Sequence, residues 1–215
     1  MYAYNGIGLL ALRQGNLPRA LPLLERALGL NQEADLPLFF PWIAAPLGAA
    51  YALAGRLDDA VPLLTQALEQ VTATGTVIHQ ALCGLSLGEG QLLAGHLEET
   101  HALTEGVLAH ARERQERGCQ AYALRLLGDI AAHRVPPDVD AAAAYYRQAL
   151  ALAEALGMRP LQAHCHWGLG TLYAATGQWE QACTALSTAI ELYRAMDMTF
   201  WLPETEAALA QVEGR

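Results

Sequence analysis

The sequence predicts an all-α fold: an α-α superhelix of five helix–turn–helix repeats of about 40 residues, closed by a C-terminal capping helix. The first observation is a glycine that recurs at 40-residue intervals, with one interval of 42, each time after a large aliphatic residue: Gly8, Gly48, Gly88, Gly128 and Gly170. The second is another glycine seven residues later in four of the five copies, at Gly15, Gly55, Gly95 and Gly177. The third is a composition with 53% hydrophobic residues, rich in the helix-forming residues alanine and leucine.

Each repeat is expected to form a helix, a short turn and a second helix. The second glycine stands where the first helix must end, because glycine adopts a positive φ without steric cost. Small residues follow at fixed spacing, and they let two helices approach closely: Ala20, Ala60, Thr100 and Ala182. One such hairpin cannot bury its apolar face alone, so neighbouring hairpins are expected to stack into a continuous core.

The five repeats are predicted to span residues 1–40, 41–80, 81–120, 121–162 and 163–200, followed by the capping helix at 201–213, all within a single repeat domain. In the fourth copy, Val135-Pro136-Pro137 interrupts the register where the second glycine should be. Ala142 and Tyr146 resume the pattern with an offset of two, which accounts for the interval of 42. The first repeat begins almost at Met1 without a cap, which suggests a piece of a longer chain.

These motifs resemble the tetratricopeptide repeat, whose pattern is Leu-Gly-x-x-Tyr, then Gly, then Ala, then Ala-Leu. The second copy carries Leu47-Gly48 and Tyr51, then Gly55, Ala60 and Ala67-Leu68, and the fifth follows the same order from Leu169-Gly170 to Ala189-Ile190. The third copy departs most, with Gln91, Thr100 and Val107 in the positions of the tyrosine and two alanines. The usual family period is 34 residues, so the resemblance implies longer second helices here.

The segments 157–164 and 195–203 are similar in style to the C-terminal repeat regions of bacterial signalling proteins that carry a nucleotide cyclase or a regulatory ATPase. This resemblance implies that the array serves regulation or assembly, although none of the catalytic segments of such proteins is present in the sequence.

The net charge of −9 makes nucleic acid and anionic membrane surfaces unexpected partners, because phosphates repel an acidic protein. No apolar stretch reaches the roughly 20 residues that a membrane-spanning helix needs. The four cysteines are widely spaced, which favours reduced thiols in a cytoplasmic protein: Cys83, Cys119, Cys165 and Cys183.

Two motifs hint at catalysis or metal binding, but their context is unfavourable. The segment 84–88 matches the G-x-S-x-G elbow of hydrolases, yet Ser86 is expected within a helix and not after a strand. Three residues that commonly bind metals stand together at His164-Cys165-His166. On a helix their side chains point to different faces, so they do not converge on one ion. We therefore expect no enzyme activity, no metal and no cofactor.

The resemblance implies that the first helices line a concave groove, where ligands of such arrays usually lie. The row six residues before each repeat glycine is largely aromatic, which suits a peptide or a helix. In the fourth copy Arg125, Asp129 and His133 are four residues apart, and the simplest alternative is that Arg125 and Asp129 pair with each other. The expected groove residues are Tyr2, Asn5, Arg13, Trp42, Glu89, Tyr122, Arg125, Asp129, His133, His164 and Trp167.

Together these observations predict a non-catalytic protein–protein interaction or scaffolding module, a regulatory part of a larger bacterial signalling protein. The expected partner is a protein or peptide segment, including another domain of the parent chain. Two alternatives remain: a small-ligand sensor that uses the groove, and a self-association module that forms homo-oligomers through the uncapped N-terminal face.

Overall fold

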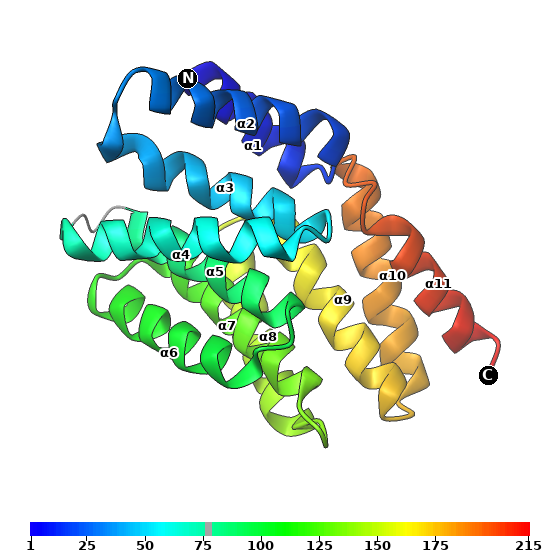
Figure 1. Cartoon of the computed structure of the whole chain (residues 1–215). Helices are drawn as coiled ribbons and strands as arrows, with labels where there is room; N and C mark the ends of the chain where they lie inside the picture. Colours follow the sequence, from blue (N-terminus) through cyan, green and yellow to red (C-terminus); the bar gives the residue numbers. More distant parts are fainter. Residues whose placement is uncertain (76–78) are drawn as a thin grey trace. The chain divides into compact units, whose positions relative to one another are not determined.

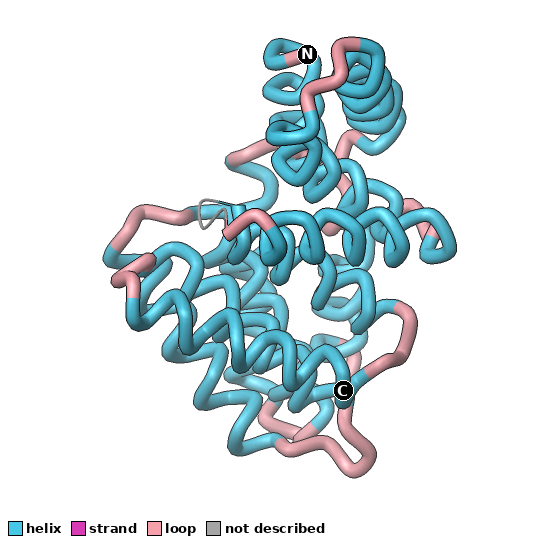
Figure 2. Tube along the Cα trace, turned by 60° about the vertical axis from the view of Figure 1, so that its left-hand side comes forward, coloured by secondary structure: helices cyan, strands magenta, loops and turns pink. Residues whose placement is uncertain are grey.

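The computed structural model describes residues 1–75 and 79–215, and these residues form α-helices joined by short turns, without any strand (Figures 1 and 2). The contacts between Cα atoms divide the chain into two compact units, Met1–Val107 and Leu108–Arg215. The predicted all-α fold, with antiparallel helix pairs in sequence and a closing helix, is confirmed. The prediction that residues 1–215 form a single domain remains a prediction.

In the first unit, each hairpin consists of a first helix, a tight turn and a 17-residue second helix. The elements are α1 (Tyr2–Arg13), α2 (Leu17–Glu33), the 3-10 turn η1 (Pro37–Phe39), α3 (Phe40–Leu53), α4 (Leu57–Ala73), α5 (Gln80–Leu93) and most of α6 (Leu97–Glu113). Residues 76–78 of the predicted second repeat lie outside the described residues.

The second unit contains the end of α6 and five further helices: α7 (Arg117–His133), α8 (Val139–Ala155), α9 (Arg159–Ala175), α10 (Trp179–Ala195) and α11 (Leu202–Glu213). The two-residue insertion lies in the turn between α7 and α8, as predicted, and α11 occupies the predicted capping segment. α7 and α9 begin before the predicted repeat starts at 121 and 163, because the preceding helices end at the turns around Gln115 and Gly157.

The turn within a hairpin uses the predicted glycine. Gly15, Gly55, Gly95 and Gly177 all have φ between 74° and 83°. A second left-handed position was not foreseen: it ends every second helix, with the same 40-residue spacing and one interval of 42. Its residues are Asp35, Gly75, Gln115, Gly157 and Asp197, with φ between 49° and 65°. Three of these five positions therefore carry a side chain in a conformation that costs a non-glycine residue roughly 1–2 kcal/mol.

The repeat glycine provides room for a residue of its own second helix. A Cβ atom built on Gly48 would lie 2.4 Å from Cγ of Leu64, and Gly8 faces Leu24 and Gly170 faces Leu186 in the same way. All three leucines are fully buried. The small residue is therefore required by close helix packing within the hairpin and not by a turn.

Two hairpins replace this leucine. In the third, the equivalent residue is Thr104, which is buried and donates its hydroxyl hydrogen to the carbonyl oxygen of Thr100 at 2.6 Å. In the fourth, it is Tyr146, whose ring fills the space beside Gly128. The threonine leaves less apolar volume between the helices of the third hairpin, which matches the degeneracy of that copy in the sequence.

Candidate functional site

In the first unit, the predicted aromatic row is assembled around Tyr2. Its ring lies 5.3 Å from the ring of Trp42, between centroids, and 5.5 Å from that of Phe39 in an edge-to-face arrangement. Tyr2 is 58% exposed, whereas Trp42 and Phe39 are half-buried. Phe39 was missed by the sequence analysis because it lies in the turn before α3, outside the helical register. These three rings form an accessible aromatic surface that can hold an apolar side chain.

Asn5, another of the predicted groove residues, lies on α1 and has no exposed surface. Neither its Nδ2 nor its Oδ1 has a hydrogen-bond partner among the described residues. The repeat register did not reveal that the Asn5 side chain is fully covered. Arg13 is exposed at the end of α1, and Glu89 is half-buried on α5.

In the second unit, Arg125 and Asp129 form an ion pair one helical turn apart on α7, with side chains only 15% and 14% exposed. The hydroxyl of Tyr146 on α8 donates a hydrogen bond to the other carboxylate oxygen of Asp129, at 2.7 Å. Both oxygens of Asp129 are therefore engaged by this protein's own groups. His133 does not reach the carboxylate, because its Nδ1 lies 2.8 Å from the backbone carbonyl oxygen of Asp129.

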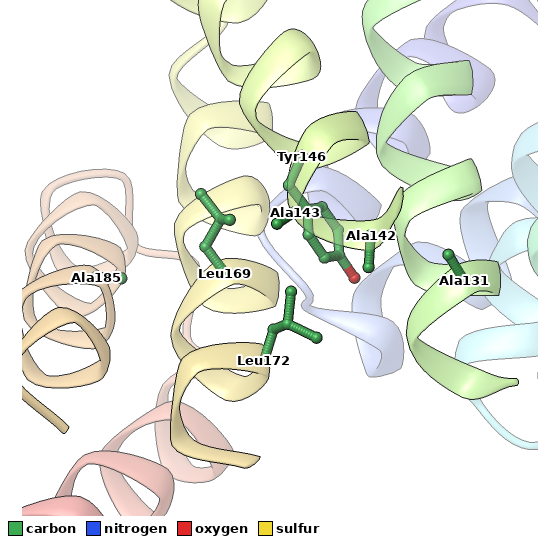
Figure 3. Packing of buried hydrophobic residues seen from close by; sticks show 7 residues of the cluster. All are labelled: Ala131, Ala142, Ala143, Tyr146, Leu169, Leu172 and Ala185. Carbon is green, nitrogen blue, oxygen red and sulfur yellow. The ribbon is translucent and has the colours of Figure 1, made fainter. Parts of the chain in front are cut away.

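Tyr146 is held between two glycines of neighbouring helices. A Cβ atom on Gly128 of α7 would lie 2.7 Å from its Cδ1, and a Cβ atom on Gly168 of α9 would lie 2.6 Å from its Cζ. Figure 3 shows the ring between α7 and α9, with Leu169 and Leu172 packed beside it. The ring of Tyr146, which orients Asp129, therefore fits only because Gly128 and Gly168 carry no side chains.

Burial is the main influence on the ionisable groups around this pair. Burial, followed by the charge of Asp129, raises the pKa of Tyr146 well above its usual range. Burial also raises the pKa of the Cys165 thiol to about 12, although the positive charge of Arg125 partly opposes the shift. A neutral phenol and a neutral thiol beside a closed ion pair are poor nucleophiles.

A second aromatic group surrounds His164 on α9. Its Nδ1 lies 2.7 Å from the hydroxyl of Tyr193, and its ring packs edge-to-face against Trp201 with centroids 4.9 Å apart. Tyr193 and Trp201 are stacked on each other. Trp167 packs beside the same cluster with its Nε1 buried and without a hydrogen-bond partner among the described residues.

The structure thus brings some predicted residues together and leaves others apart. Tyr2 contacts Trp42, and Arg125 contacts Asp129. Tyr122 is half-buried on α7. Ser86 lies within α5, as the sequence predicted, and the structure shows that it is buried, so its surroundings are not those of a hydrolase elbow.

Within residues 1–75 and 79–215, no three His, Cys, Asp or Glu side chains are arranged to hold a metal ion. In the same part of the chain, every helix is too short or too polar to cross a lipid bilayer.

A model of the tetratricopeptide repeat family matches residues 1–38 and 138–197. Among solved structures, a Rap protein complexed with competence and sporulation factor is 16% identical with a TM-score of 0.82, over 98% of this chain and 62% of that one. A signal transduction ATPase with numerous domains and a tetratricopeptide repeat sensor, from Pyrococcus horikoshii, is 19% identical with a TM-score of 0.64. BtubC from P. vanneervenii is 16% identical, with the same TM-score, over 95% of this chain and 83% of its own.

At these identities the similarity concerns the fold. The chain spans 62% of the length of the Rap protein and 32% of the length of the ATPase. No curated protein matches the sequence.

Proposed function

Because this chain is a tetratricopeptide-repeat protein, we propose that it is a non-catalytic interaction module whose first helices hold a segment of another protein. The observation that carries the proposal is the accessible aromatic surface of Tyr2, Phe39 and Trp42 on the first unit. Aromatic rings provide rigid contact area at a small cost in conformational entropy, which is why they dominate binding surfaces.

Proximity crosslinking in the native host, followed by mass spectrometry, tests this proposal. Replacing Tyr2 and Trp42 by alanine should abolish capture of the partner while the circular dichroism spectrum stays unchanged. The matched control is Trp179→Ala, because Trp179 is 38% exposed but belongs to the second helix α10. Equal capture by all three proteins would refute binding through the first helices.

A second candidate is a small-ligand sensor centred on Arg125 and Asp129. The observation that favours it is an ion pair shielded from solvent and oriented by Tyr146, which is the kind of polar group that fixes a ligand in an apolar site. Similarity to an ATPase with a tetratricopeptide repeat sensor also supports a sensor role. A thermal-shift screen with sugars, nucleotides and amino acids tests it, and the absence of any shift would count against a sensor.

The chain is further proposed to be a regulatory part of a larger bacterial signalling protein, acting in the cytoplasm. Support comes from the fold shared with the sensor-bearing ATPase and from four thiols that are all free. Sequencing of the full-length transcript tests this, because a cyclase or ATPase segment in the same reading frame is the expected result.

Self-association is the third proposal, and α1 supports it. Ile7 is 44% exposed and Leu10 is 61% exposed, although both lie in a helix that otherwise packs against α2 and α3. Large apolar side chains that share one exposed helical face commonly mark a contact with another molecule. Sedimentation equilibrium of the purified protein tests this, and a monomer at millimolar concentration would refute self-association.

A further inference from the structure

Tyr146 joins a predicted groove residue on α7 to the packing between helices. Its hydroxyl, carried by α8, donates a hydrogen bond to Oδ1 of Asp129 at 2.7 Å. The leucines at the equivalent position of the first, second and fifth hairpins have no polar side-chain atom: Leu24, Leu64 and Leu186. In the third hairpin, the hydroxyl of Thr104 bonds to its own helix. A change at Asp129 can therefore reach the interior of the fourth hairpin through a bond that these other hairpins lack.

The two hydrogen bonds to Asp129 come from donors of different charge. Oδ2 accepts from the positively charged guanidinium of Arg125, whereas Oδ1 accepts from the neutral hydroxyl of Tyr146. A positively charged donor attracts a carboxylate more strongly than a neutral donor does. A cationic group that approaches Asp129 therefore gains most at Oδ1, where it replaces the hydroxyl of Tyr146 and leaves Arg125 in place.

The surroundings of Asp129 favour such a cation. Its side chain is 14% exposed, so the carboxylate is shielded from water but not closed off from solvent. Shielding strengthens the attraction between opposite charges. The formal net charge of the chain is −9, so the field of the whole protein also favours cations over anions near its surface.

Loss of the bond to Asp129 has a consequence inside the hairpin. The hydroxyl of Tyr146 would have no acceptor, and water does not reach it freely, because only 3% of the residue is exposed. An unpaired buried hydroxyl destabilises the packing around it. The ring lies between α7 and α9 (Figure 3), where Gly128 and Gly168 leave little room for it to turn. Relief therefore requires α8 to move relative to α7 and α9, with which it packs.

We propose that Asp129 binds a cationic group of a ligand, an ammonium or a guanidinium, and that Tyr146 transmits this contact to the packing of α8 against α7 and α9. The proposal rests on the sensor function given above as the second candidate, and it adds the charge of the ligand and the helix that responds. α8 packs tightly when Oδ1 of Asp129 holds the hydroxyl, and more loosely when Oδ1 holds the ligand.

Isothermal titration calorimetry of the full chain with agmatine and putrescine, to millimolar concentration, tests the charge of the ligand. These probes carry guanidinium and ammonium groups, and butanediol is the neutral control. Both cationic probes should bind to the wild type and not to Asp129→Asn, which keeps an acceptor oxygen for Tyr146 but loses the charge. Equal binding to Asp129→Asn would refute the site.

The thermal-shift screen separates this proposal from the sensor function itself. If neither cationic probe binds while a sugar, nucleotide or amino acid shifts the melting temperature, the sensor survives and the cationic ligand is refuted. Silence in both experiments would refute the sensor as well.

Tyr146→Phe tests the competition at Oδ1, because phenylalanine keeps the ring between the helices and removes the hydroxyl. The cationic probes should bind about tenfold tighter to this variant, since they no longer displace a hydrogen bond. A hydroxyl with a purely structural role gives equal or weaker binding on removal, and that result would overturn the proposal.

Hydrogen exchange measured by mass spectrometry reports the response of α8. Agmatine should speed the exchange of α8 amides in the wild type and leave it unchanged in Tyr146→Phe. Tyr173→Phe is the matched control, because the hydroxyl of Tyr173 on α9 accepts a hydrogen bond from Arg147 of α8 at 3.0 Å, a contact that does not involve Asp129. This control should respond like the wild type. An equal response of α8 in Tyr146→Phe would show that the hydroxyl does not transmit the contact.

Discussion

Gly168→Ala should destabilise the second unit, although alanine is the better helix former. The new Cβ atom would lie 2.6 Å from Cζ, 2.7 Å from Cε1 and 3.0 Å from the hydroxyl oxygen of Tyr146. The ring has little room to move, because Gly128 contacts it from the other side and its hydroxyl is bonded to Asp129.

The magnitude follows from two opposing contributions. Alanine in place of glycine within a helix stabilises by about 1 kcal/mol. Overpacking a rigid aromatic ring costs roughly 1–3 kcal/mol, and the upper part of that range applies when the ring is confined on both sides. We therefore expect a net loss of about 2 kcal/mol in the free energy of unfolding.

Urea denaturation followed by circular dichroism is the assay. The control is Gly29→Ala on α2, where nothing lies within 4 Å of the added Cβ atom, so stability should rise. Tyr146→Leu should relieve Gly168→Ala, because leucine lacks the Cζ and hydroxyl atoms that clash. If Gly168→Ala stabilises the protein as much as Gly29→Ala does, the confinement of Tyr146 is refuted.

Three further outcomes follow from the described residues. Burial raises the pKa of the Cys83 and Cys165 thiols from 9.0 to about 12, so both stay protonated in the folded chain while the unfolded chain releases those protons. The free energy of unfolding should therefore fall by about 1.4 kcal/mol per pH unit per thiol between pH 9.0 and about 12. Urea titrations at several pH values check this, and a flat profile would contradict it. Gln115→Gly should stabilise by about 1 kcal/mol because the residue has φ of 56°, and an unchanged urea midpoint would argue against strain there. Gly55→Ala should destabilise by about 1 kcal/mol for the converse reason, φ being 75°, and thermal unfolding that matches the wild type would disprove it.

The repeat architecture could be predicted because each part of the motif answers a local physical demand. Gly15 and Gly55 adopt the positive φ that ends the first helix, and Gly48 leaves the space that Leu64 fills. Such demands recur in most copies, so the spacing of residue types carries them. The left-handed position at the end of each second helix escaped notice because Asp35 and Gln115 break the glycine pattern there.

The candidate site was predicted less completely, because it depends on contacts between helices. The register placed Arg125 and Asp129 on one face of α7, and the anticipated pairing is present. It did not indicate that Tyr146 reaches Asp129 from α8, since this contact requires the gaps left by Gly128 and Gly168. It also could not distinguish Asn5, which is fully covered, from Tyr2, which is largely exposed on the same helix.

Thr104 bears on how the chain loses its structure. A repeat array is held together by interactions between nearest neighbours, so its cooperativity is limited by the weakest of them. Threonine fills less apolar volume than the leucines of the first, second and fifth hairpins or the tyrosine of the fourth. Its hydroxyl donates a hydrogen bond to a carbonyl oxygen of its own helix. Amide hydrogens of α6 should therefore exchange with solvent earlier than those of α4 or α10, and global melting should separate into two transitions with α6 as the boundary.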